Sequence, residues 1–553
     1  MSLRERSFPT LRSSAIAYED DDVVLIDKPP FVPSQASRDD AHDDLPTRLA
    51  AFLTERDGAP AYVGTHQRLD RATSGLIAYA KRREANAWLA RAFEGREVDK
   101  TYLAVVSGQK LPSQARWQDA LVPNGERMEI ASARAEGAVI AKTRMKVIEQ
   151  RGDRALVQLD IETGRTHQIR AQLAHRGAPV VGDALYGGAP FRRLALHSSA
   201  LTIPRPGAPS IAVRSAPPLA FARALASEPS DVLDASQREP ILRDAAEHRW
   251  ALAHGDGTSC FRWLNESGDG APRIAVDVYG EHAVLHAYGE DDVSGLAEAL
   301  VAAGARGVYL KRRPKTASRL DEAAMHALAP PDPIAGEAAD AELEVRENGL
   351  PFLVRLGDGL STGLFLDQRA NRARVRAEAG GARVLNLFSY TCAFSIAAAA
   401  GGAREVLSVD AAKKQLERGN RGFAHAGLDA AVHETIADDA FDVLDRLARR
   451  GRTFDLVVCD PPTFSSTKKS RFTSGKMWID LAARLLRVVA PGGCVLATSN
   501  DRRGRQDELR RAFHTAAKSL DVRLAQAKDL APPVDYPVLP GEEPHLKAVW
   551  VTR

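Results

Sequence analysis

The sequence predicts a multidomain chain with an N-terminal α+β domain, a small central α+β domain and a C-terminal α/β domain. The chain has 553 residues, too many for a single hydrophobic core. A stretch rich in Pro, Ala and Ser at 204–245 separates two patterned regions. From about residue 342 onward, strand-like and helix-like segments alternate, which is typical of a parallel sheet with helices on both faces.

The N-terminal region begins with two predicted strands, 15–18 and 23–26, which flank an acidic turn and end before Pro29 and Pro30. Helical spacing follows at 45–56 and 83–94, and strand patterns follow at 101–107 and 154–161. We interpret the first half of 204–245 as the last strand of this domain and the second half as a linker. The predicted domain limits are therefore 1–228, a linker at 229–245, 246–345 and 346–553.

The central and C-terminal regions continue this pattern. In the central region we expect strands at 273–278, 283–288 and 307–311, a helix at 292–303 and a loop at 328–341. In the C-terminal region we expect strands at 383–388, 405–409, 454–459 and 493–498, with helices at 393–400, 412–426 and 476–488.

Composition excludes several classes of protein. Hydrophobic content of 44% and charged content of 27% are ordinary for globular proteins, and a net charge of +3 does not by itself indicate a nucleic-acid partner. The four cysteines are widely spaced without a CxxC pair, which favours reduced thiols over a disulfide frame or a zinc site. No apolar run approaches the ~20 residues of a membrane span. We expect a cytoplasmic protein with no membrane partner and no metal.

One set of residues suits chemistry on a nucleoside. Asp70 lies in a loop of sequence RLDRATSGL, Tyr102 in KTYLAVVSG, and Arg170 ends the run TGRTHQIR. Isomerising uridine to its C-glycoside requires a carboxylate that acts on the sugar, a cation that keeps this carboxylate ionised, and an aromatic ring against the flipped base. Such a reaction needs no cofactor.

In their order, these blocks resemble the RluA-type RNA pseudouridine synthases over residues 14–226. The resemblance implies a mixed, largely antiparallel sheet. It also implies that Asp70 is the catalytic aspartate, Tyr102 the stacking tyrosine and Arg170 the ion-pair partner. The expected RNA contacts are Arg68, Arg71, Arg165, His167 and Ile169, with Ile169 packing under the base. One departure is Gln67, which occupies the place of the family's usual histidine, while His66 lies one step earlier.

A second set of residues suits S-adenosylmethionine (SAM). SAM requires a turn after the first strand, an acid at the end of the next strand for the ribose hydroxyls, and a polar clamp on adenine. The run VLNLFSYTC supplies the turn, with Tyr390 and Cys392 in places that glycines often occupy. Asp410 ends the next strand, and Asp439 is our choice for the adenine amine. The expected cofactor contacts are Gln368, Asn386, Phe388, Tyr390, Thr391, Asp410, Asp439 and Asp460.

The fourth strand ends in Asp460-Pro461-Pro462, where rigid prolines would present carbonyls and a carboxylate, and Phe464 would stack on a base. Together with the runs STGLFLDQR, NLFSYT and WLNESGDG, this segment resembles the large-subunit ribosomal RNA methyltransferases of the RlmI and RlmK kind over 245–553. The resemblance implies a Rossmann-like class I methyltransferase fold, a small substrate domain, SAM as cofactor and large-subunit ribosomal RNA as partner. Asp460 is the expected catalytic residue, and Pro462 and Phe464 are expected RNA contacts.

The methyl acceptor is a separate question. Methylation of cytosine C5 requires a cysteine thiolate that attacks C6, whereas a ring nitrogen requires only alignment with the methyl group. The strand segment VLATSN has no cysteine at its end, and we expect Cys459 and Cys494 to be buried in strands and Cys392 to lie in the SAM turn. We therefore favour a nitrogen acceptor such as guanine N7 and keep cytosine C5 as an alternative.

We expect a bifunctional enzyme of RNA modification and rRNA processing, with isomerase and transferase activities. Basic runs at 369–376, 468–476 and 502–505 are expected to contact phosphate groups. Two alternatives remain. One is a 5-methylcytosine methyltransferase whose synthase half has weak catalysis and only positions RNA. The other is a methyltransferase with a substrate other than RNA.

Overall fold

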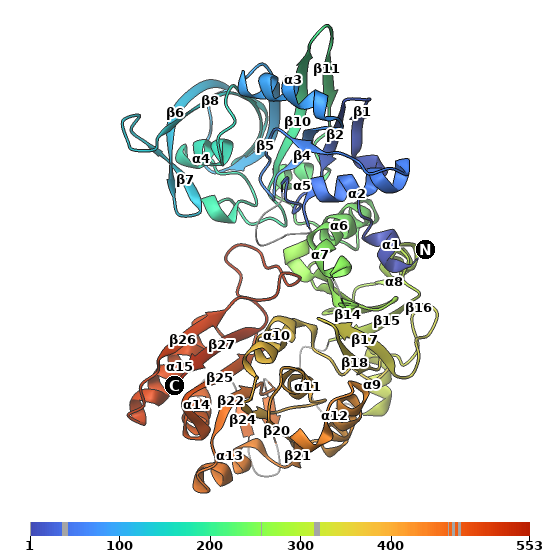
Figure 1. Ribbon diagram of the computed structural model, residues 1–553, viewed down its shortest axis with the longest axis vertical. Coiled ribbons are helices and arrows are strands. Elements are labelled where there is room, and N and C mark those ends of the chain that lie inside the picture. Colours follow the sequence, from blue (N-terminus) through green and yellow to red (C-terminus); the bar gives the residue numbers. More distant parts are fainter. Residues whose placement is uncertain are drawn as a thin grey trace.

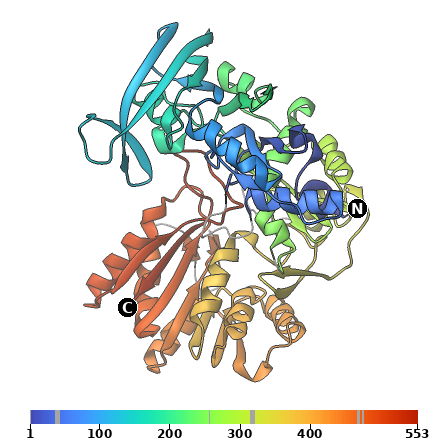
Figure 2. The same ribbon diagram turned by 45° about the horizontal axis from the view of Figure 1, so that its top comes forward.

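The computed structural model describes residues 2–35, 43–255, 257–313, 321–462 and 477–553, with the backbone of 464–466 and 471–473. Three sheets dominate this part of the chain, with 11, five and seven strands, and two small hairpins accompany them. Figures 1 and 2 show the N-terminal sheet at one end of the molecule and the C-terminal sheet at the other, with the central domain between them along one side.

The N-terminal sheet has the order β1-β2-β4-β10-β5-β9-β8-β6-β7, with β3 on β4 and β11 on β10. Among the described strands of this sheet, only the β4–β10 pair is parallel, so the expected mixed, largely antiparallel sheet is confirmed. The strands are β1 (Ile16–Glu19), β2 (Val23–Lys28), β3 (Gly64–Thr65), β4 (Ser74–Ala80), β5 (Asp99–Ser107), β6 (Gln114–Asn124), β7 (Arg127–Ala131), β8 (Val139–Arg151), β9 (Arg154–Ile161), β10 (Leu196–Arg205) and β11 (Ala208–Arg214).

Helices cover both faces of this sheet around β4. The helical segments are η1 (Ser13–Ala15), α2 (Leu45–Asp57), α3 (Arg83–Glu94), α4 (Gln168–His175), η2 (Ala184–Tyr186) and α5 (Ala220–Ala226). Alternate residues of β4 pack against α3 on one face and α2 on the other. Burial on both faces explains why this strand is a continuous apolar run and not an alternating one.

The central domain is built on the order β12-β13-β14-β15-β16. Its strands are β12 (Cys260–Asn265), β13 (Ile274–Tyr279), β14 (His282–Ala287), β15 (Gly307–Arg312) and β16 (Ala335–Gly336), and its helical segments are α6 (Ala235–His248), α7 (Trp250–His254), η3 (Glu266–Asp269), α8 (Ser294–Ala302) and α9 (Glu322–Leu328).

Two segments from outside the predicted limits join the central core. Phe8, which follows helix α1 (Leu3–Ser7), packs edge-on against Phe261 with ring centroids 5.3 Å apart. Helix α6 occupies most of the predicted linker at 229–245, and its apolar face lies in the same core. We did not predict this helix because Pro240 lies in its first turns and proline usually interrupts a helix.

The C-terminal sheet has the order β21-β20-β19-β22-β25-β27-β26. Its strands are β19 (Arg383–Leu387), β20 (Glu405–Asp410), β21 (His433–Ala437), β22 (Phe454–Cys459), β25 (Val489–Ser499), β26 (Gln526–Leu530) and β27 (Lys547–Thr552). The expected parallel pairing is confirmed from β21 to β25, whereas β27 and β26 extend the sheet by antiparallel pairing that we did not predict.

Helices cover both faces of the C-terminal sheet, and two hairpins flank it. The helical segments are η4 (Leu366–Gln368), α10 (Arg369–Glu378), α11 (Ala393–Ala400), α12 (Lys413–His425), η5 (Ala430–Val432), α13 (Ala440–Arg449), α14 (Met477–Val488) and α15 (Gln506–Ser519). The hairpins are β17 (Leu343–Glu347) with β18 (Leu350–Val354), and β23 (Phe464–Ser466) with β24 (Arg471–Thr473). This arrangement confirms the predicted Rossmann-like α/β fold.

A buried ionic network joins the central and C-terminal domains. Asp535, fully buried, accepts hydrogen bonds from Nη1 of Arg369 at 2.9 Å and from the backbone N–H of Arg262 at 2.9 Å. Arg249, also fully buried, donates to the carboxylate of Asp269 and to the carbonyl of Asp535. Breaking such a pair leaves a buried charge without a partner, at a cost of about 3–5 kcal/mol. The two domains are therefore held in a defined geometry.

Among the described residues, no helix is both long enough and apolar enough to cross a membrane.

Candidate active sites

The Asp70 loop connects β3 to β4 and is fixed at several points. The backbone N–H of Thr73 donates to the carbonyl of Asp70 at 3.0 Å, which closes a tight turn. Leu69, directly before the aspartate, exchanges two hydrogen bonds with the hydroxyl of Ser34. Gly75 follows with φ +106, where a Cβ atom would lie 2.3 Å from the carbonyl oxygen of Ser198. Only glycine fits this position, so the start of β4 is positioned by a close approach to β10.

Arg170 bridges two carboxylates. Its Nη1 donates to Oδ2 of Asp70 at 3.1 Å, while Nε and Nη2 donate to the two oxygens of Asp183 at 2.7 and 2.8 Å. Burial opposes the guanidinium charge, but the hydrogen bonds and charge of Asp183 outweigh it and raise the pKa of Arg170. The predicted hydrogen-bonded pair of Arg170 and Asp70 is therefore present. Asp183 orients the guanidinium of Arg170 through its two other hydrogen bonds.

Tyr102 of β5 and Ile169 of α4 are both buried and line the same cavity as Asp70. Burial, and then the charge of Asp70, raise the pKa of Tyr102, so its phenol stays protonated at neutral pH. A neutral ring beside an apolar side chain suits stacking against a base.

The cavity around Asp70 has a volume of about 430 Å³. The predicted residues that line it are Arg68, Asp70, Tyr102, Arg165, His167, Ile169 and Arg170. Arg71 is the exception, because its Nε donates to the carbonyl of Phe31 at 2.8 Å and it does not line the cavity. His167 has left-handed backbone geometry (φ 50), and its Nδ1 lies 3.1 Å from the hydroxyl of Tyr186.

Three residues of this site were not predicted. Asp183 lies in the run PVVGD, and only the tertiary fold brings it against Arg170. Lys100 lines the cavity, and burial lowers its pKa. Gln67 also lines the cavity, and within the described chain its buried Nε2 has no hydrogen-bond partner. The sequence had shown that Gln67 replaces the family's usual histidine, but not which group Gln67 contacts.

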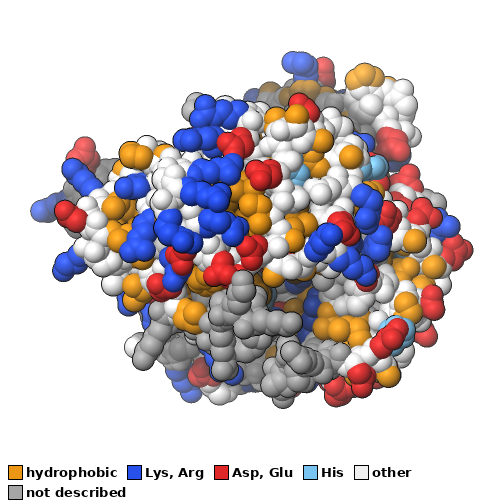
Figure 3. All heavy atoms as spheres, turned by 90° about the horizontal axis from the view of Figure 1, so that it is seen from below, with side chains coloured by type: hydrophobic (Ala, Val, Ile, Leu, Met, Phe, Trp, Pro, Cys, Tyr) orange, Lys and Arg blue, Asp and Glu red, His pale blue; other side chains and the backbone are white. Residues whose placement is uncertain are grey.

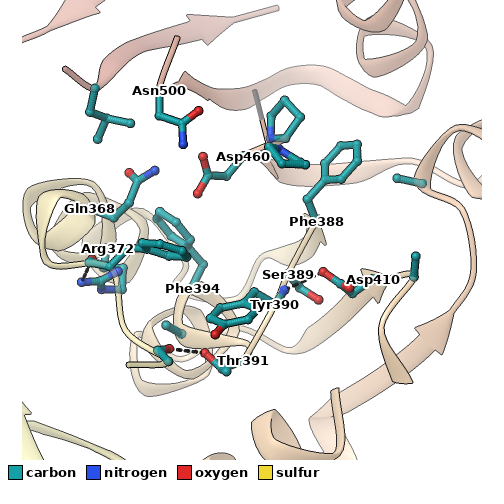
Figure 4. A pocket seen from close by; sticks show the side chains of 18 of the residues that line it. Gln368, Arg372, Phe388, Ser389, Tyr390, Thr391, Phe394, Asp410, Asp460 and Asn500 are labelled. Atoms are coloured by element: carbon teal, nitrogen blue, oxygen red, sulfur yellow. Dashed lines mark hydrogen bonds between the residues drawn. The ribbon is translucent and has the colours of Figure 1, made fainter. Parts of the chain in front are cut away.

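In the C-terminal domain, the turn after β19 adopts an unusual backbone. Phe388, Tyr390 and Cys392 all have positive φ, at 57, 47 and 60. Non-glycine residues rarely adopt this conformation, and each instance costs about 1–3 kcal/mol unless its surroundings hold it. The turn is held by Thr391, whose hydroxyl donates to the carbonyl of Gly363 at 2.6 Å (Figure 4). Such strain, concentrated beside a cavity, is typical of a binding site.

Asp410, at the end of β20, accepts two backbone hydrogen bonds. Tyr390 donates to Oδ2 and Ala412 donates to Oδ1, both at 2.8 Å. Each carboxylate oxygen retains a lone pair for a further donor, which the two hydroxyls of a ribose would satisfy. Asp410 therefore both braces the strained turn and faces the cavity.

The cavity beside this turn has a volume of about 320 Å³. Figure 4 shows the carboxylate of Asp460, the amides of Gln368 and Asn500 and the ring of Phe388 around one hollow. Gln368 donates to the hydroxyl of Thr498 at 3.2 Å, and Thr498 in turn donates to Asp460 at 2.5 Å. The predicted residues that line the cavity are Gln368, Phe388, Tyr390, Thr391, Asp410, Asp439, Asp460 and Pro462.

Two predicted residues are not found in the described lining of this cavity. Asn386 is buried in the middle of β19, where its amide donates to Ser395 at 2.8 Å, and it does not line the cavity. The side chain of Phe464 lies outside the described residues, as do Lys468, Lys469 and Lys476. Asp439 does line the cavity, but its carboxylate also caps α13 by accepting from the backbone N–H of Phe441 at 2.9 Å.

Asp367 is a site residue that we did not predict. Its carboxyl group lines the cavity, and burial, reinforced by the charge of Asp460, raises its pKa to about 6. Burial also raises the pKa of Asp460. Two neighbouring carboxylates disfavour each other's ionisation, so a cation in this cavity would be favoured.

The cysteines do not reach the cavity. Burial raises the pKa of Cys459 well above its ordinary value and that of Cys392 to about 11. Cys494 is half-buried on β25, with its sulfur 3.5 Å from the hydroxyl of Thr552. No cysteine is found among the described residues that line the cavity, and no described group of His, Cys, Asp and Glu could hold a metal ion.

Two arginines of the basic run at 369–376 are buried and have structural partners. Arg369 is buried against Asp535, and Arg372 is buried against Glu347, to which its Nε donates at 2.8 Å. Helix α10 turns both side chains inward, so the expected phosphate contacts of these two residues are wrong. At 502–505, Arg503 and Arg505 are exposed, whereas Arg502 pairs with Glu266.

Comparison with known proteins relates the two parts of the chain to two families. Residues 22–175 match the model of a family described as RNA pseudouridylate synthase, and residues 316–542 match that of a family described as S-adenosylmethionine-dependent methyltransferase. A ribosomal RNA large subunit methyltransferase of Deinococcus radiodurans is 33% identical over 315 residues, which cover 56% of this chain and 76% of that protein. The chain belongs to the ribosomal RNA large subunit methyltransferase family.

Other relatives agree with this assignment. The ribosomal RNA large subunit methyltransferase I of Klebsiella pneumoniae is 30% identical over 285 residues, 50% of this chain and 69% of that protein. A Streptococcus mutans structure provisionally described as a SAM-dependent methyltransferase is 25% identical with a TM-score of 0.51, and it covers 64% of this chain and 88% of its own. The predicted fusion of a pseudouridine synthase-type domain with a SAM-dependent methyltransferase is confirmed, as is SAM as the cofactor of the second half.

Proposed function

We propose that the chain is a bifunctional RNA modification enzyme that isomerises uridine to pseudouridine and methylates a base in large-subunit (23S) ribosomal RNA. The observation that carries this proposal is the presence of two separate cavities, each with a complete set of groups for its own reaction. Asp70, Arg170 and Tyr102 meet in one cavity, and Gln368, Asp410 and Asp460 meet in the other. The ribosomal target rests on the names of the relatives.

In the first cavity Asp70 acts on the ribose of a flipped uridine. The bond between N1 and C1′ breaks, the base turns, C5 bonds to C1′, and the proton lost from C5 is balanced by one gained at N1. Arg170 orients the carboxylate of Asp70 through their 3.1 Å hydrogen bond. Tyr102 supports the turning base from one side, and its buried phenol is placed to carry a proton. These groups need no cofactor.

In the second cavity, Asp410 suits the ribose of SAM, and the left-handed turn at 388–392 lets the backbone approach the methionine end. SAM supplies an activated methyl group when bound. Gln368 and Thr498 hold the carboxylate of Asp460 toward the cavity. Methylating guanine N7 places a positive charge on the purine, which the carboxylates of Asp367 and Asp460 would stabilise.

A nitrogen acceptor is also supported by the state of the thiols. Attack on C6 of cytosine needs a thiolate within reach of the base. Burial keeps Cys392 and Cys459 protonated, and the described lining of the cavity contains no cysteine. We therefore favour guanine N7 over cytosine C5.

Assay of the purified full-length chain on large-subunit ribosomal RNA tests this proposal. We expect both pseudouridine and a methylated guanine by nucleoside mass spectrometry, with the methyl group traced from labelled SAM. Appearance of 5-methylcytosine without pseudouridine would favour the alternative in which the synthase half only positions RNA. SAM turnover that RNA does not stimulate would favour a substrate other than RNA.

A further inference from the structure

Helix α6 has two different faces, and each contacts a different half of the protein. Ile241, Leu242, Ala245 and Ala246 pack into the core of the central domain. Asp244, Glu247 and His248, spaced three and four residues apart, share another face of the helix. Figure 1 shows α6 between the N-terminal sheet and the central domain. This second face meets loops of the synthase domain.

Asp244 begins a chain of hydrogen bonds that leads to the Asp70 loop. Its Oδ2 accepts from Nη1 of Arg192 at 2.7 Å and from Nη1 of Arg193 at 3.1 Å. Arg193 uses its other terminal nitrogen, Nη2, to donate to the hydroxyl of Ser74 at 2.6 Å. Ser74 is the first residue of β4, four positions after Asp70. One buried guanidinium therefore connects α6 to the strand that starts directly after the catalytic loop.

A second contact reaches the same loop from the other side. The ring of His248 stacks on that of Phe31, with centroids 4.6 Å apart. The carbonyl of Phe31 accepts from Nε of Arg71, the neighbour of Asp70. Phe31 has a left-handed φ of 71, a strained conformation that persists only where packing holds it. Lys28, also buried, donates to the carbonyl of Arg71 at 3.0 Å.

Burial makes these hydrogen bonds costly to break. Asp244, Arg193 and Ser74 are each less than about one-tenth exposed. The pKa of Asp244 is lowered, because the charges of Arg193 and Arg192 outweigh the effect of its burial. Removing that charge would leave two buried guanidinium groups without their shared partner, so Arg193 would have to move. Ser74 would then lose its donor.

We infer that Asp244 is a positioning residue for pseudouridine formation, acting through Arg193 and Ser74 to hold the Asp70 loop. Helix α6 thereby makes the synthase site depend on a segment whose other face is buried in the central domain. This inference rests on the proposed synthase activity.

The test compares full-length variants. Asp244→Asn keeps the shape of the side chain and removes its charge, and Glu239→Gln is a matched control on the exposed part of α6, where the Glu239 side chain is 78% exposed. A displacement of about 1 Å in a catalytic group can cost ~100-fold in rate, so we expect Asp244→Asn to lower kcat for pseudouridine by at least about tenfold. KM for RNA and the methylation rate should stay within about twofold, since those contacts are unchanged.

A double-variant cycle separates positioning from loss of stability. If Asp244 acts through Ser74, the pair Asp244→Asn with Ser74→Ala should be no slower than the slower single variant. Additive losses, an equal fall in methylation, or an unchanged rate in Asp244→Asn would overturn the inference.

Hydrogen exchange of residues 68–75 gives a readout that does not depend on activity. Exchange should rise in Asp244→Asn and not in Glu239→Gln, and unchanged exchange in Asp244→Asn would also overturn the inference. A wild-type chain that forms no pseudouridine would instead contradict the proposed function, while the exchange result would still decide whether Asp244 holds the loop.

Discussion

Individual carboxylates behave differently in the two cavities because their neighbours differ. Asp70 faces the guanidinium of Arg170, whose other side is held by Asp183. Asp367 instead lies near a second carboxylate, Asp460, whose charge adds to burial in raising the pKa of Asp367, and burial also raises the pKa of Asp460. In the first arrangement a guanidinium orients one carboxylate, and the second arrangement favours binding of a cation.

Asp70→Asn should abolish pseudouridine formation while methylation continues at its wild-type rate. The substitution keeps the size of the side chain and its place beside Arg170, but the amide cannot act as a nucleophile or base on the ribose. We expect a loss of at least about 10³-fold, as for removal of an essential catalytic group. Nucleoside analysis of one reaction mixture measures both products.

Glu162→Gln is the matched control for this variant, because Glu162 lines the same cavity but is exposed and does not contact Arg170 in the described structure. Its rate should be close to that of the wild type. Persistence of pseudouridine in Asp70→Asn would show that the nucleophile has been assigned to the wrong residue.

The affinity for SAM should rise with pH between about 5 and 7. Asp367 has a pKa of about 6, so its carboxyl is mostly protonated at pH 5 and mostly ionised at pH 7. The sulfonium of SAM favours the ionised form, so binding below pH 6 must release a proton and is weaker. Calorimetry at several pH values measures this dependence. Asp367→Asn should flatten it, and an identical pH profile in that variant would exclude Asp367 as the cause.

Among the elements, the turn after β19 and the end of β20 form one unit. The strained residues Phe388 and Tyr390 are held partly by the hydrogen bond from Tyr390 to Asp410. Loss of Asp410 would therefore remove a ribose acceptor and release the turn together. Effects of such linked groups are not additive.

Asp410→Ala should weaken SAM binding by at least about tenfold, which corresponds to ~1.4 kcal/mol. The reason is the simultaneous loss of two oxygen acceptors and of the brace on the turn. Calorimetric titration measures the change. Glu417→Gln, on the exposed face of α12, is the control and should bind SAM like the wild type. An unchanged dissociation constant in Asp410→Ala would remove this residue from the cofactor site.

Much of the secondary structure followed from local patterns, but several functional contacts did not. The strand that carries Tyr102 and the strand that ends at Asp410 were predicted because apolar periodicity and turn residues are local signals. Asp183 and Asp367 were missed because their roles depend on residues brought near them by folding. Arg372 was misassigned because a basic run does not reveal which helix face is buried. Helix α6 was missed because Pro240 lies in its first turns and because its burial depends on contacts with two separate domains.

At the scale of the whole molecule, the central domain and α6 connect the pseudouridine synthase-type domain to the methyltransferase domain. The buried network around Asp535 fixes the central domain to the methyltransferase, and Asp244 fixes it to the synthase. In the view from below, Lys and Arg side chains gather over part of the surface, with acidic side chains among them (Figure 3). The basic side chains gathered on this face are of the kind that contacts phosphate groups.

RNA affinity should fall steeply as salt rises. About six phosphate contacts would lose roughly 10³-fold in affinity between 50 and 200 mM salt. Replacing exposed Arg503 and Arg505 with alanine should reduce the slope, because both follow Asn500 at the edge of the methyltransferase cavity. Binding measured over a salt series gives the slope. Affinity that does not change with salt would contradict phosphate contacts.

The central claim is that one chain places two different marks on ribosomal RNA. Its most direct test is nucleotide-resolution mapping of pseudouridine and base methylation in 23S rRNA from cells that lack the gene, complemented with wild type, Asp70→Asn or Asp410→Ala. We predict that deletion removes one or more marks of each kind. Asp70→Asn should restore only the methyl group, and Asp410→Ala should restore only pseudouridine. Persistence of both kinds of mark in the deletion strain would contradict the claim.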